Sequence, residues 1–314
     1  MIEKTKKRIL ISLVLAGIIY LGFTIYGDFD RLTDAFSVFP WYIYPLLLLL
    51  SSINYIFRFI KWDYYLRIVG VTISKGDSFG IFMSGLIMSI TPGKFGEVLK
   101  AYLVKQVDGT PISKTTPIIF VERITDFLSL ILITLLGAFL FDYGRGIISA
   151  VGLFFVIVIV LISHRGWAVS VLNQLHKIRF IQKLSDPIQN AYESSYQLLR
   201  PGPLFYMTAV SLFSWIFECL GYYIILINFN LDISIIWASF AYGFATIVGA
   251  ITMMPGGLGV TEGSLTFLAM GVGASREVAV AATFIIRAVT LWFAVLVGVI
   301  AVSVYQRKIG NEID

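Results

Sequence analysis

Long stretches of apolar residues dominate the chain, and short polar segments separate them. A helix needs about 20 predominantly apolar residues to cross a bilayer, with a lower limit of roughly 17. Six stretches approach or exceed this length and are predicted to be spanning helices: 9–26, 41–60, 116–141, 146–163, 204–228 and 277–305. The pattern therefore predicts an all-α polytopic membrane protein, with residues 1–314 forming a single integral membrane domain.

Two further apolar regions, 78–105 and 233–273, are each interrupted by a Pro-Gly turn. The second half of each region is short and carries a carboxylate near its start, Glu97 or Glu262. Broken helices are tolerated at membrane depth where protein or a wet cavity surrounds them. We therefore expect two re-entrant hairpins, each entering and leaving on one side of the membrane. The expected turn residues are Pro92, Gly93, Gly96, Pro255, Gly256, Gly257 and Gly259.

Positive charges indicate how these segments are oriented, because cytoplasmic loops of membrane proteins are rich in Lys and Arg. Most of the 24 Lys and Arg residues fall on one side if the N-terminus, the loops 58–75, 105–114 and 164–202, and the C-terminal tail are cytoplasmic. The outer side then receives only Arg31, Arg145 and Arg276. We expect a multi-pass protein of the cell membrane with both termini in the cytoplasm. The first hairpin then opens from the cytoplasm and the second from outside.

The two interrupted regions resemble each other. Pro-Gly-Lys-Phe-Gly at 92–96 matches Pro-Gly-Gly-Leu-Gly at 255–259, and Phe-x-x-Arg follows at 120–123 and at 284–287. Two matches in register favour duplication over chance. Because the two copies have opposite predicted orientations, we expect an inverted repeat, an arrangement that places a site near the membrane midplane.

The repeat halves are predicted at about 41–163 and 204–305, and residues 165–200 link them. Apolar residues recur at helical spacing in this linker, with basic residues between them. We expect cytoplasmic amphipathic helices here, interrupted at Pro187. A simple connector between the halves is the alternative.

Composition excludes several other classes of protein. The chain is 58% hydrophobic and only 14% charged, unlike a soluble domain. Cys219 is the sole cysteine and there are only two histidines, so we predict no metal site and no cofactor. The sequence pI is about 9.1. We attribute the excess of positive charge to membrane topology and to contact with anionic lipids, and we expect no nucleic-acid partner.

Ionisable side chains within membrane segments are costly and usually face a cavity or a partner. The predicted substrate-binding residues are Lys94, Glu97, Lys100, Glu122, Arg123, Asp126, Glu218, Glu262 and Arg287. Structural roles stay open beside this one. The charged side chains in 122–126 are alternatively explained by a structural ion pair or by snorkelling to the membrane interface. Glu218 could be protonated and hydrogen-bonded between helices. Glu97 and Glu262 could cap the helices that they begin. Arg287 needs an anionic partner, either Glu218 or a ligand.

Catalytic motifs are absent from the sequence. It contains no Gly-x-Ser-x-Gly elbow, no Walker loop and no DDxxD cluster, and we expect neither histidine to activate a Ser or Cys. We therefore do not expect an enzyme.

Three segments resemble the lysylphosphatidylglycerol synthase transmembrane region, also called the flippase-like domain family. They are Thr-Pro-Gly-Lys-Phe-Gly-Glu-Val-Leu-Lys at 91–100, Val-Glu-Arg-Ile-Thr-Asp at 121–126 and Met-Pro-Gly-Gly-Leu-Gly-Val-Thr-Glu at 254–262. The resemblance covers nearly the whole chain and implies movement of a polar lipid between leaflets. The soluble synthase domain of the family follows its membrane region, and the sequence leaves no room for that domain before Asp314. A stand-alone member that does not modify lipid is expected.

The resulting hypothesis is a flippase that works without ATP hydrolysis on a phospholipid or a polyprenyl-linked lipid. Arg123 and Arg287 receive the lipid phosphate. The carboxylates neutralise the arginines when the site is empty, or bind a cationic headgroup or protons. Two alternatives stay open: a secondary transporter of a small solute or ion, and a non-transporting partner of a membrane glycosyltransferase. A homo-oligomer or a complex with a lipid-modifying enzyme also stays open.

Overall fold

The computed structural model describes residues 2–165 and 185–313, and within these ranges every regular element is helical and no strand occurs. In chain order the longer helices are α1 (Ile2–Gly27), α2 (Phe29–Val38), α3 (Tyr44–Ile68), α4 (Lys75–Gly85), α5 (Val98–Asp108), α6 (Ile112–Leu140), α7 (Arg145–Ser163), α9 (Ser185–Leu198), α10 (Pro201–Asn228), α11 (Ile235–Ile251), α12 (Val260–Gly271), α13 (Arg276–Arg287) and α14 (Phe293–Ile313). Short helical turns are η1 (Trp41–Ile43), η2 (Leu86–Ile90), η3 (Pro92–Glu97), η5 (Pro255–Gly257) and η6 (Ala288–Trp292). The predicted all-α class is confirmed.

Four stretches in the described part of the chain are long and apolar enough to cross a membrane, judged by length and composition: Trp41–Ile68, Arg145–Ser163, Pro201–Asn228 and Arg276–Tyr305. They correspond to four of the six predicted spans. The other two predicted spans lie in α1 and α6. Of these, α6 is 29 residues long and carries the charged residues of 122–126. The total of six spans stays a prediction.

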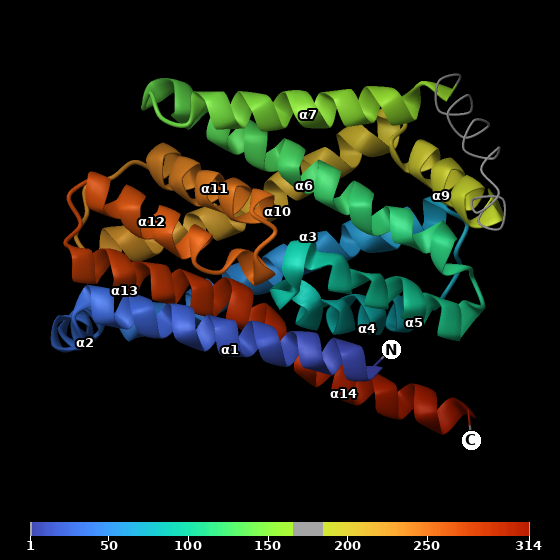
Figure 1. Ribbon diagram of the computed structural model, residues 1–314, viewed down its shortest axis with the longest axis horizontal. Helices are drawn as coiled ribbons and strands as arrows, with labels where there is room; N and C mark the ends of the chain where they lie inside the picture. The colour runs from blue at the N-terminus through green and yellow to red at the C-terminus, as the bar shows by residue number, and fades with distance from the viewer. Residues whose placement is uncertain (1, 166–184, 314) are drawn as a thin grey trace.

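Figure 1 shows an elongated bundle with α4, α5 and α9 towards one end and α11, α12 and α13 towards the other. One hydrophobic core gathers side chains from α10 to α13 together with the start of α3 and the end of α6. The second core gathers the end of α3, the start of α6, and α4, α5 and α14. Each core therefore takes helices from both halves of the sequence.

Helical hairpins form in both regions where the sequence predicts broken helices. The first runs through α4 and η2 to a turn and returns through η3 and α5, which packs against α4. The second runs along α11, turns at η5 and returns as α12, which packs against α11. The hairpins approach from opposite ends of the long axis, and their tips, η3 and η5, touch each other (Figure 1).

The two turns have different backbones although their sequences are alike. The first is a six-residue 3-10 helix, whereas the second combines a three-residue 3-10 helix with left-handed glycines. These glycines are Gly256, Gly257 and Gly259. Gly256 has a φ of 60°, and a Cβ there would lie 3.1 Å from Leu291 and 3.6 Å from the Cα of Ile90 in the first hairpin. Glycine has no Cβ, so it allows both the left-handed backbone and the close approach of the two hairpins at this position.

The connections between helices also recur along the chain. α10 ends and α11 begins 160 residues after α3 ends and α4 begins. In both places a left-handed residue follows the first helix, Gly70 or Asn230, and a serine side chain caps the second helix, Ser74 or Ser234. Glycine and asparagine are the residues that most readily adopt the left-handed backbone, and serine is a preferred N-cap. Further along, α13 begins 164 residues after α6, the spacing that also separates Arg123 from Arg287.

Matched residues of the two halves contact one another reciprocally. Asn54 Nδ2 donates to the Ser214 carbonyl at 2.9 Å, and Ser214 Oγ donates to the Asn54 carbonyl at 3.2 Å, across a separation of 160 residues. Helix pairs are exchanged in the same way, because α4 packs on α14 and α11 packs on α6. Reciprocal contacts of this kind are characteristic of two units related by a two-fold axis.

Two boundaries differ from the sequence-based expectation. The span predicted at 41–60 continues to Ile68, so Arg58 and Lys61 lie inside α3 and not in a cytoplasmic loop. The expected span ended at the first charges, but partners on neighbouring helices bury these charges. The helix predicted at 277–305 contains the π-helical turn η6 directly after Arg287. Residues 166–184 of the expected amphipathic linker lie outside the described residues, and α9 begins two residues before Pro187.

Candidate functional site

Seven of the nine ionisable residues predicted for the site gather in two buried networks, one at each hairpin. In the first, three cations surround the Glu97 carboxylate at the end of η3. Lys100 Nζ and Arg123 Nη2 each lie 3.4 Å from Glu97 Oε2, and Arg58 Nη2 lies 3.9 Å from Oε1. Because these cations belong to α5, α6 and α3, the carboxylate connects the hairpin tip to two long helices.

Lys100 extends this first network into the interior of the hairpin. Its Nζ lies 2.6 Å from Glu122 Oε2 and 4.6 Å from the centre of the Trp62 ring. The stem of Lys100 passes so close to α4 that a Cβ at Gly85 would lie 2.6 Å from its Cγ. A buried ammonium group is stabilised here by a carboxylate and by the face of an aromatic ring.

Lys61 is a member of this network that the sequence analysis missed, because it placed the residue in a loop. Its ammonium group lies 2.5 Å from Asp126 Oδ1 and 2.6 Å from Ser211 Oγ, and it also donates to Thr125 Oγ1 at 3.2 Å. The side chain is only 1% exposed. A signal was present in the sequence, since Lys61 follows Arg58 by three residues and the two share a helix face.

Arg123 is loosely held in the first network. Both of its carboxylate contacts, to Glu97 and to Asp126, are 3.4 Å long, and its Nε is buried without a hydrogen-bond partner. Its side chain is 19% exposed. Among the side chains that the structure describes, the first network contains four cations, Arg58, Lys61, Lys100 and Arg123, and three carboxylates, Glu97, Glu122 and Asp126. The surplus positive charge and the unmet donor both suit an anion.

The second network is tightly closed around Glu262 and Arg287. Arg287 Nε lies 2.7 Å from Glu262 Oε1, and its Nη2 donates to the Gly256 carbonyl at 2.6 Å. Glu262 Oε2 accepts the backbone N–H of Gly259 at 2.7 Å, and Oε1 accepts the Tyr20 hydroxyl at 3.3 Å. These contacts fix the left-handed turn from both sides.

The capping alternative therefore applies to only one of the two hairpin carboxylates. Glu262 caps α12 through Gly259, whereas Glu97 sits at the N-cap position of α5 and makes no capping hydrogen bond. Arg287 pairs with Glu262, a carboxylate that was expected to neutralise an arginine in the empty site, and Glu218 was the other carboxylate considered as its partner. Glu218 instead accepts a 2.6 Å hydrogen bond from Tyr242 across α10 and α11.

The expected turn residues lie at the hairpin tips. Those of the first turn lie in η3, and those of the second lie in η5 and at the N-cap of α12. Lys94 lies in η3, and its side chain falls outside the described residues. Structure and sequence thus agree on the place of the turns.

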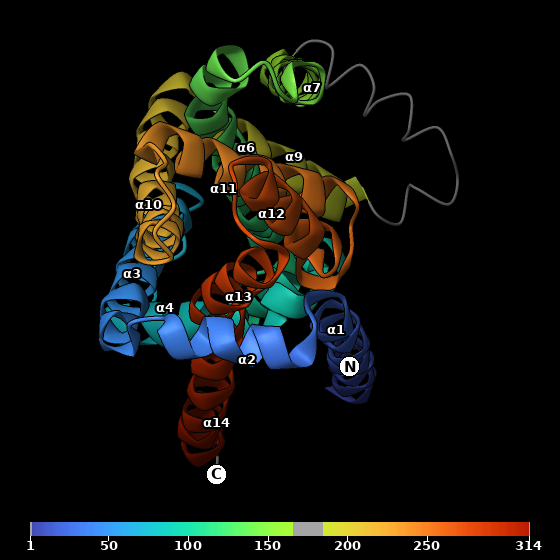
Figure 2. The ribbon, with the colours of Figure 1, turned by 90° about the vertical axis from the view of Figure 1, so that its left-hand side faces the viewer.

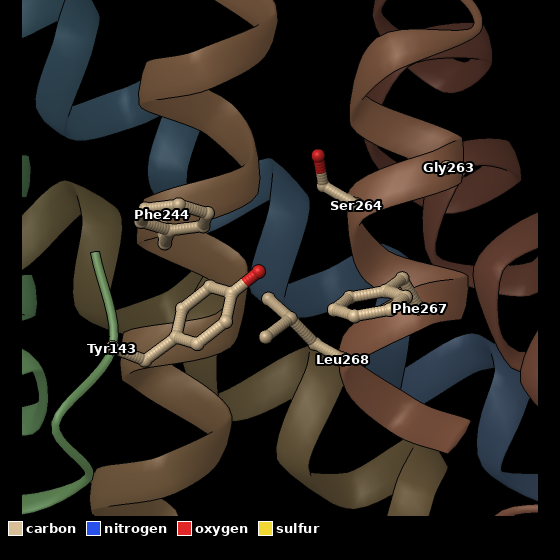
Figure 3. Close-up of a pocket in the computed structure, with 6 residues that line it drawn as sticks. All are labelled: Tyr143, Phe244, Gly263, Ser264, Phe267 and Leu268. Atoms are coloured by element: carbon tan, nitrogen blue, oxygen red, sulfur yellow. The ribbon is translucent and has the colours of Figure 1, made fainter. Parts of the chain in front are cut away.

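A pocket of about 190 Å³ lies on the second hairpin, away from both networks. Figure 3 shows Tyr143 and Phe244 facing Phe267 and Leu268 across it, with Ser264 at one side. Aromatic rings dominate its walls. None of the charged residues of either network lines it.

A helical chain with four apolar stretches of spanning length and charges buried between its helices is a multi-pass membrane protein. Residues 9–298 match the family described as "Lysylphosphatidylglycerol synthase TM region", and the chain belongs to this family. The match confirms the resemblance carried by the three sequence motifs.

Curated relatives are described as membrane proteins. A "UPF0104 membrane protein" of Methanothermobacter thermautotrophicus is 24% identical over 280 residues, which is 81% of this chain and 82% of the relative. The "UPF0104 membrane protein MJ1595" of Methanocaldococcus jannaschii is 25% identical over 335 residues, covering 99% of this chain and 98% of the relative.

Proposed function

We propose that this protein moves a lipid with a polar, phosphate-bearing headgroup between the leaflets of the cell membrane, without ATP hydrolysis. The observation that carries the proposal is the duplicated pair of a hairpin carboxylate and an arginine on a following helix. Glu97 pairs with Arg123, and Glu262 pairs with Arg287. These pairs lie beside two hairpin tips that touch. A polar path through the tips suits a headgroup whose acyl chains stay in the bilayer.

The proposed orientation makes the two hairpins re-entrant from opposite faces. The excess of Lys and Arg on the predicted cytoplasmic side supports it, and so do the matched connections at Gly70 and Asn230. Arg58 and Lys61 no longer count as cytoplasmic loop residues because they lie in α3. The predicted cytoplasmic side still has more Lys and Arg residues than the outer side. Inverted halves of this kind are common in transporters, which bind substrate where the halves meet.

Arg123 is the proposed first contact for the lipid phosphate. It is partly exposed and has an unmet Nε donor, and a guanidinium group binds phosphate with paired hydrogen bonds. Arg287 is proposed to act later in the path, after the second turn opens, because Glu262 and Gly256 hold it in the present conformation.

Lipid translocation in proteoliposomes tests this function. The fraction of a fluorescent phospholipid that an impermeant quencher reaches is followed over time. Arg123→Ala should slow translocation at least tenfold. This variant should still fold, because Glu97 keeps Lys100 and Asp126 keeps Lys61.

The matched control is Arg145→Ala, which removes an exposed arginine paired with Asp142 at the start of α7. Its rate should equal that of the wild-type protein. Equal rates for Arg123→Ala and wild type would reject the site, and no translocation by wild type with any phosphate-bearing lipid would reject the function.

A secondary transporter of a small solute or ion is the second candidate. The fully buried Lys61–Asp126 pair favours it, since buried ionisable pairs within membrane helices commonly belong to ion or proton pathways. A solute that raises the melting temperature of the detergent-solubilised protein when lipids do not would support this candidate.

A further inference from the structure

α1 lies along the edge of the bundle beside α13 (Figures 1 and 2). One face of its described part is apolar and more than half exposed, at Val14, Ile18, Leu21 and Ile25. The other face packs on the second hairpin, where Ala16 forms a small hydrophobic cluster with Leu258 and Leu291. Because an exposed apolar stripe on a membrane helix faces lipid, α1 separates this hairpin from the bilayer.

Tyr20 carries a hydroxyl group from the packed face of α1 into the second network. It donates to Glu262 Oε1 at 3.3 Å, the same oxygen that lies 2.7 Å from Arg287 Nε. The indole N–H of Trp292 donates to the Tyr20 oxygen at 2.9 Å, and the Phe284 ring lies edge-on to the Tyr20 ring with 4.9 Å between the centroids. Trp292 ends η6, the π-helical turn that follows Arg287. Tyr20 therefore closes the network on the side that α1 covers.

Two of the positions under the packed face of α1 are glycines. A Cβ at Gly259 would lie 3.6 Å from Ile19, and a Cβ at Gly263 would lie 3.9 Å from Phe23. Since neither glycine has a side chain, α1 can leave this surface without separating interlocked side chains at these two positions.

The joint between α1 and α2 suits a hinge. α1 ends at Gly27, and Asp28, with φ of 64° and ψ of 116°, interrupts the helix before α2 begins. Gly27 is buried against α13, where a Cβ on this glycine would lie 3.6 Å from Val280 Cβ. Hinges are commonly residues at the ends of helices that absorb a change in backbone angles. Tyr20 lies about two helical turns from this joint.

We propose that α1 is a lateral gate between the bilayer and Arg287, with Tyr20 as its latch. When the Tyr20 hydroxyl leaves Glu262, α1 swings about Gly27 and Asp28 and uncovers the Glu262–Arg287 pair. A headgroup then passes between the bilayer and Arg287 while its acyl chains stay in the lipid. This inference rests on the proposed function, because it gives the route by which the substrate reaches the second half of the same site.

Locking α1 in place tests the gate. Phe23→Cys/Gly263→Cys in a Cys219→Ala background places one thiol on α1 and one on α12, and a short, reducible bifunctional thiosulfonate joins them in proteoliposomes. Cross-linking should slow the translocation of a fluorescent phosphatidic acid at least tenfold. Reduction should restore the rate, which would show that the variant is folded.

The matched control is a disulfide at the hinge, Gly27→Cys/Val280→Cys in the same background. The 3.6 Å separation of the Cβ positions suits a disulfide, and this bond ties α1 to α13 where the gate does not move. Its translocation rate should equal that of the reduced protein.

A second measurement follows the movement itself and does not depend on transport. Spin labels at the exposed positions Ile18 and Phe267 report the distance between α1 and α12 by pulsed electron paramagnetic resonance in proteoliposomes. Tyr20→Phe removes only the latch hydroxyl and should at least double the population with a longer distance. Tyr26→Phe is the control, because it loses a hydroxyl contact to the Met270 sulfur near the hinge, and it should match the wild-type distances.

Unchanged translocation after cross-linking at Phe23 and Gly263 would overturn the inference, and so would an equal loss with the hinge disulfide. Identical distances in Tyr20→Phe and wild type would also overturn it. A longer distance in Tyr20→Phe, without translocation of any phosphate-bearing lipid by the wild-type protein, would reject the proposed function and leave the gate standing.

Discussion

At the scale of single residues, each buried charge is stabilised by the particular partners that its side chain can reach. Lys61 has a fully buried ammonium group, and Asp126, Ser211 and Thr125 meet its donors. Lys100 uses a different arrangement, a carboxylate on one side and the Trp62 ring on the other. The two lysines show that charge within a membrane segment is stabilised only where neighbouring helices supply specific partners.

Substitution of Lys61 tests this local balance. Lys61→Ala leaves Asp126 with a 3.4 Å ion pair to Arg123 and a hydrogen bond from Ser211, and breaking a buried ion pair costs about 3–5 kcal/mol. We expect a clear drop in the melting temperature measured by tryptophan fluorescence. Lys61→Met/Asp126→Leu should recover part of the loss, because removing both charges leaves neither one unpaired. A single variant as stable as the wild-type protein would show that the pair contributes nothing.

Sequence reasoning identified buried charges in segments that it recognised as membrane helices or hairpins, and it missed a buried charge in a segment that it assigned to a loop. It selected Glu97, Arg123 and Asp126, because charges in an apolar stretch stand out. It missed Lys61, because the charges of Arg58 and Lys61 were interpreted as the end of the span, whereas α3 continues past them to Ile68. It left the partner of Arg287 open among Glu218, the hairpin carboxylates and a ligand, since the contact with Glu262 depends on how η5 folds back towards α13.

At the scale of elements, the hairpins illustrate how far a motif determines a conformation. The Pro-Gly pattern located both turns. It did not show that one is a continuous 3-10 helix and the other left-handed, because the positive φ angles depend on the additional glycines and on the contact with Ile90. The recurring connections were also hidden in the sequence, since Gly70 and Asn230 share a backbone conformation but not an identity.

The second turn leads to a prediction about glycine. Gly256→Ala places a Cβ on a backbone with a φ of 60° and close to Leu291, and a left-handed alanine costs about 1–2 kcal/mol. We expect a lower melting temperature and slower translocation, because the tip contact weakens. Gly271→Ala is the control, since this glycine ends α12 with open space around it. Equal stability of the two variants would argue against a strained turn at Gly256.

At the scale of the whole molecule, the two sequence halves interleave so that both large hydrophobic cores draw on both halves. Asn54 and Ser214 exchange hydrogen bonds between the halves, and the two hairpin tips meet in the middle of the molecule (Figures 1 and 2). The proposed lipid path depends on one proposed property of this arrangement, namely that the halves have opposite orientations in the membrane.

The most direct test of that property is the side on which the two matched connections are exposed. Thr72 and Asp232 lie in the α3–α4 and α10–α11 connections, both are exposed, and they occupy corresponding positions 160 residues apart. Single cysteines at these positions, in a Cys219→Ala background without other cysteines, are labelled in sealed vesicles with an impermeant maleimide. We predict that Thr72→Cys reacts only from the cytoplasmic face and Asp232→Cys only from the outer face. Labelling of both positions from the same face would contradict the inverted arrangement and the path proposed through it.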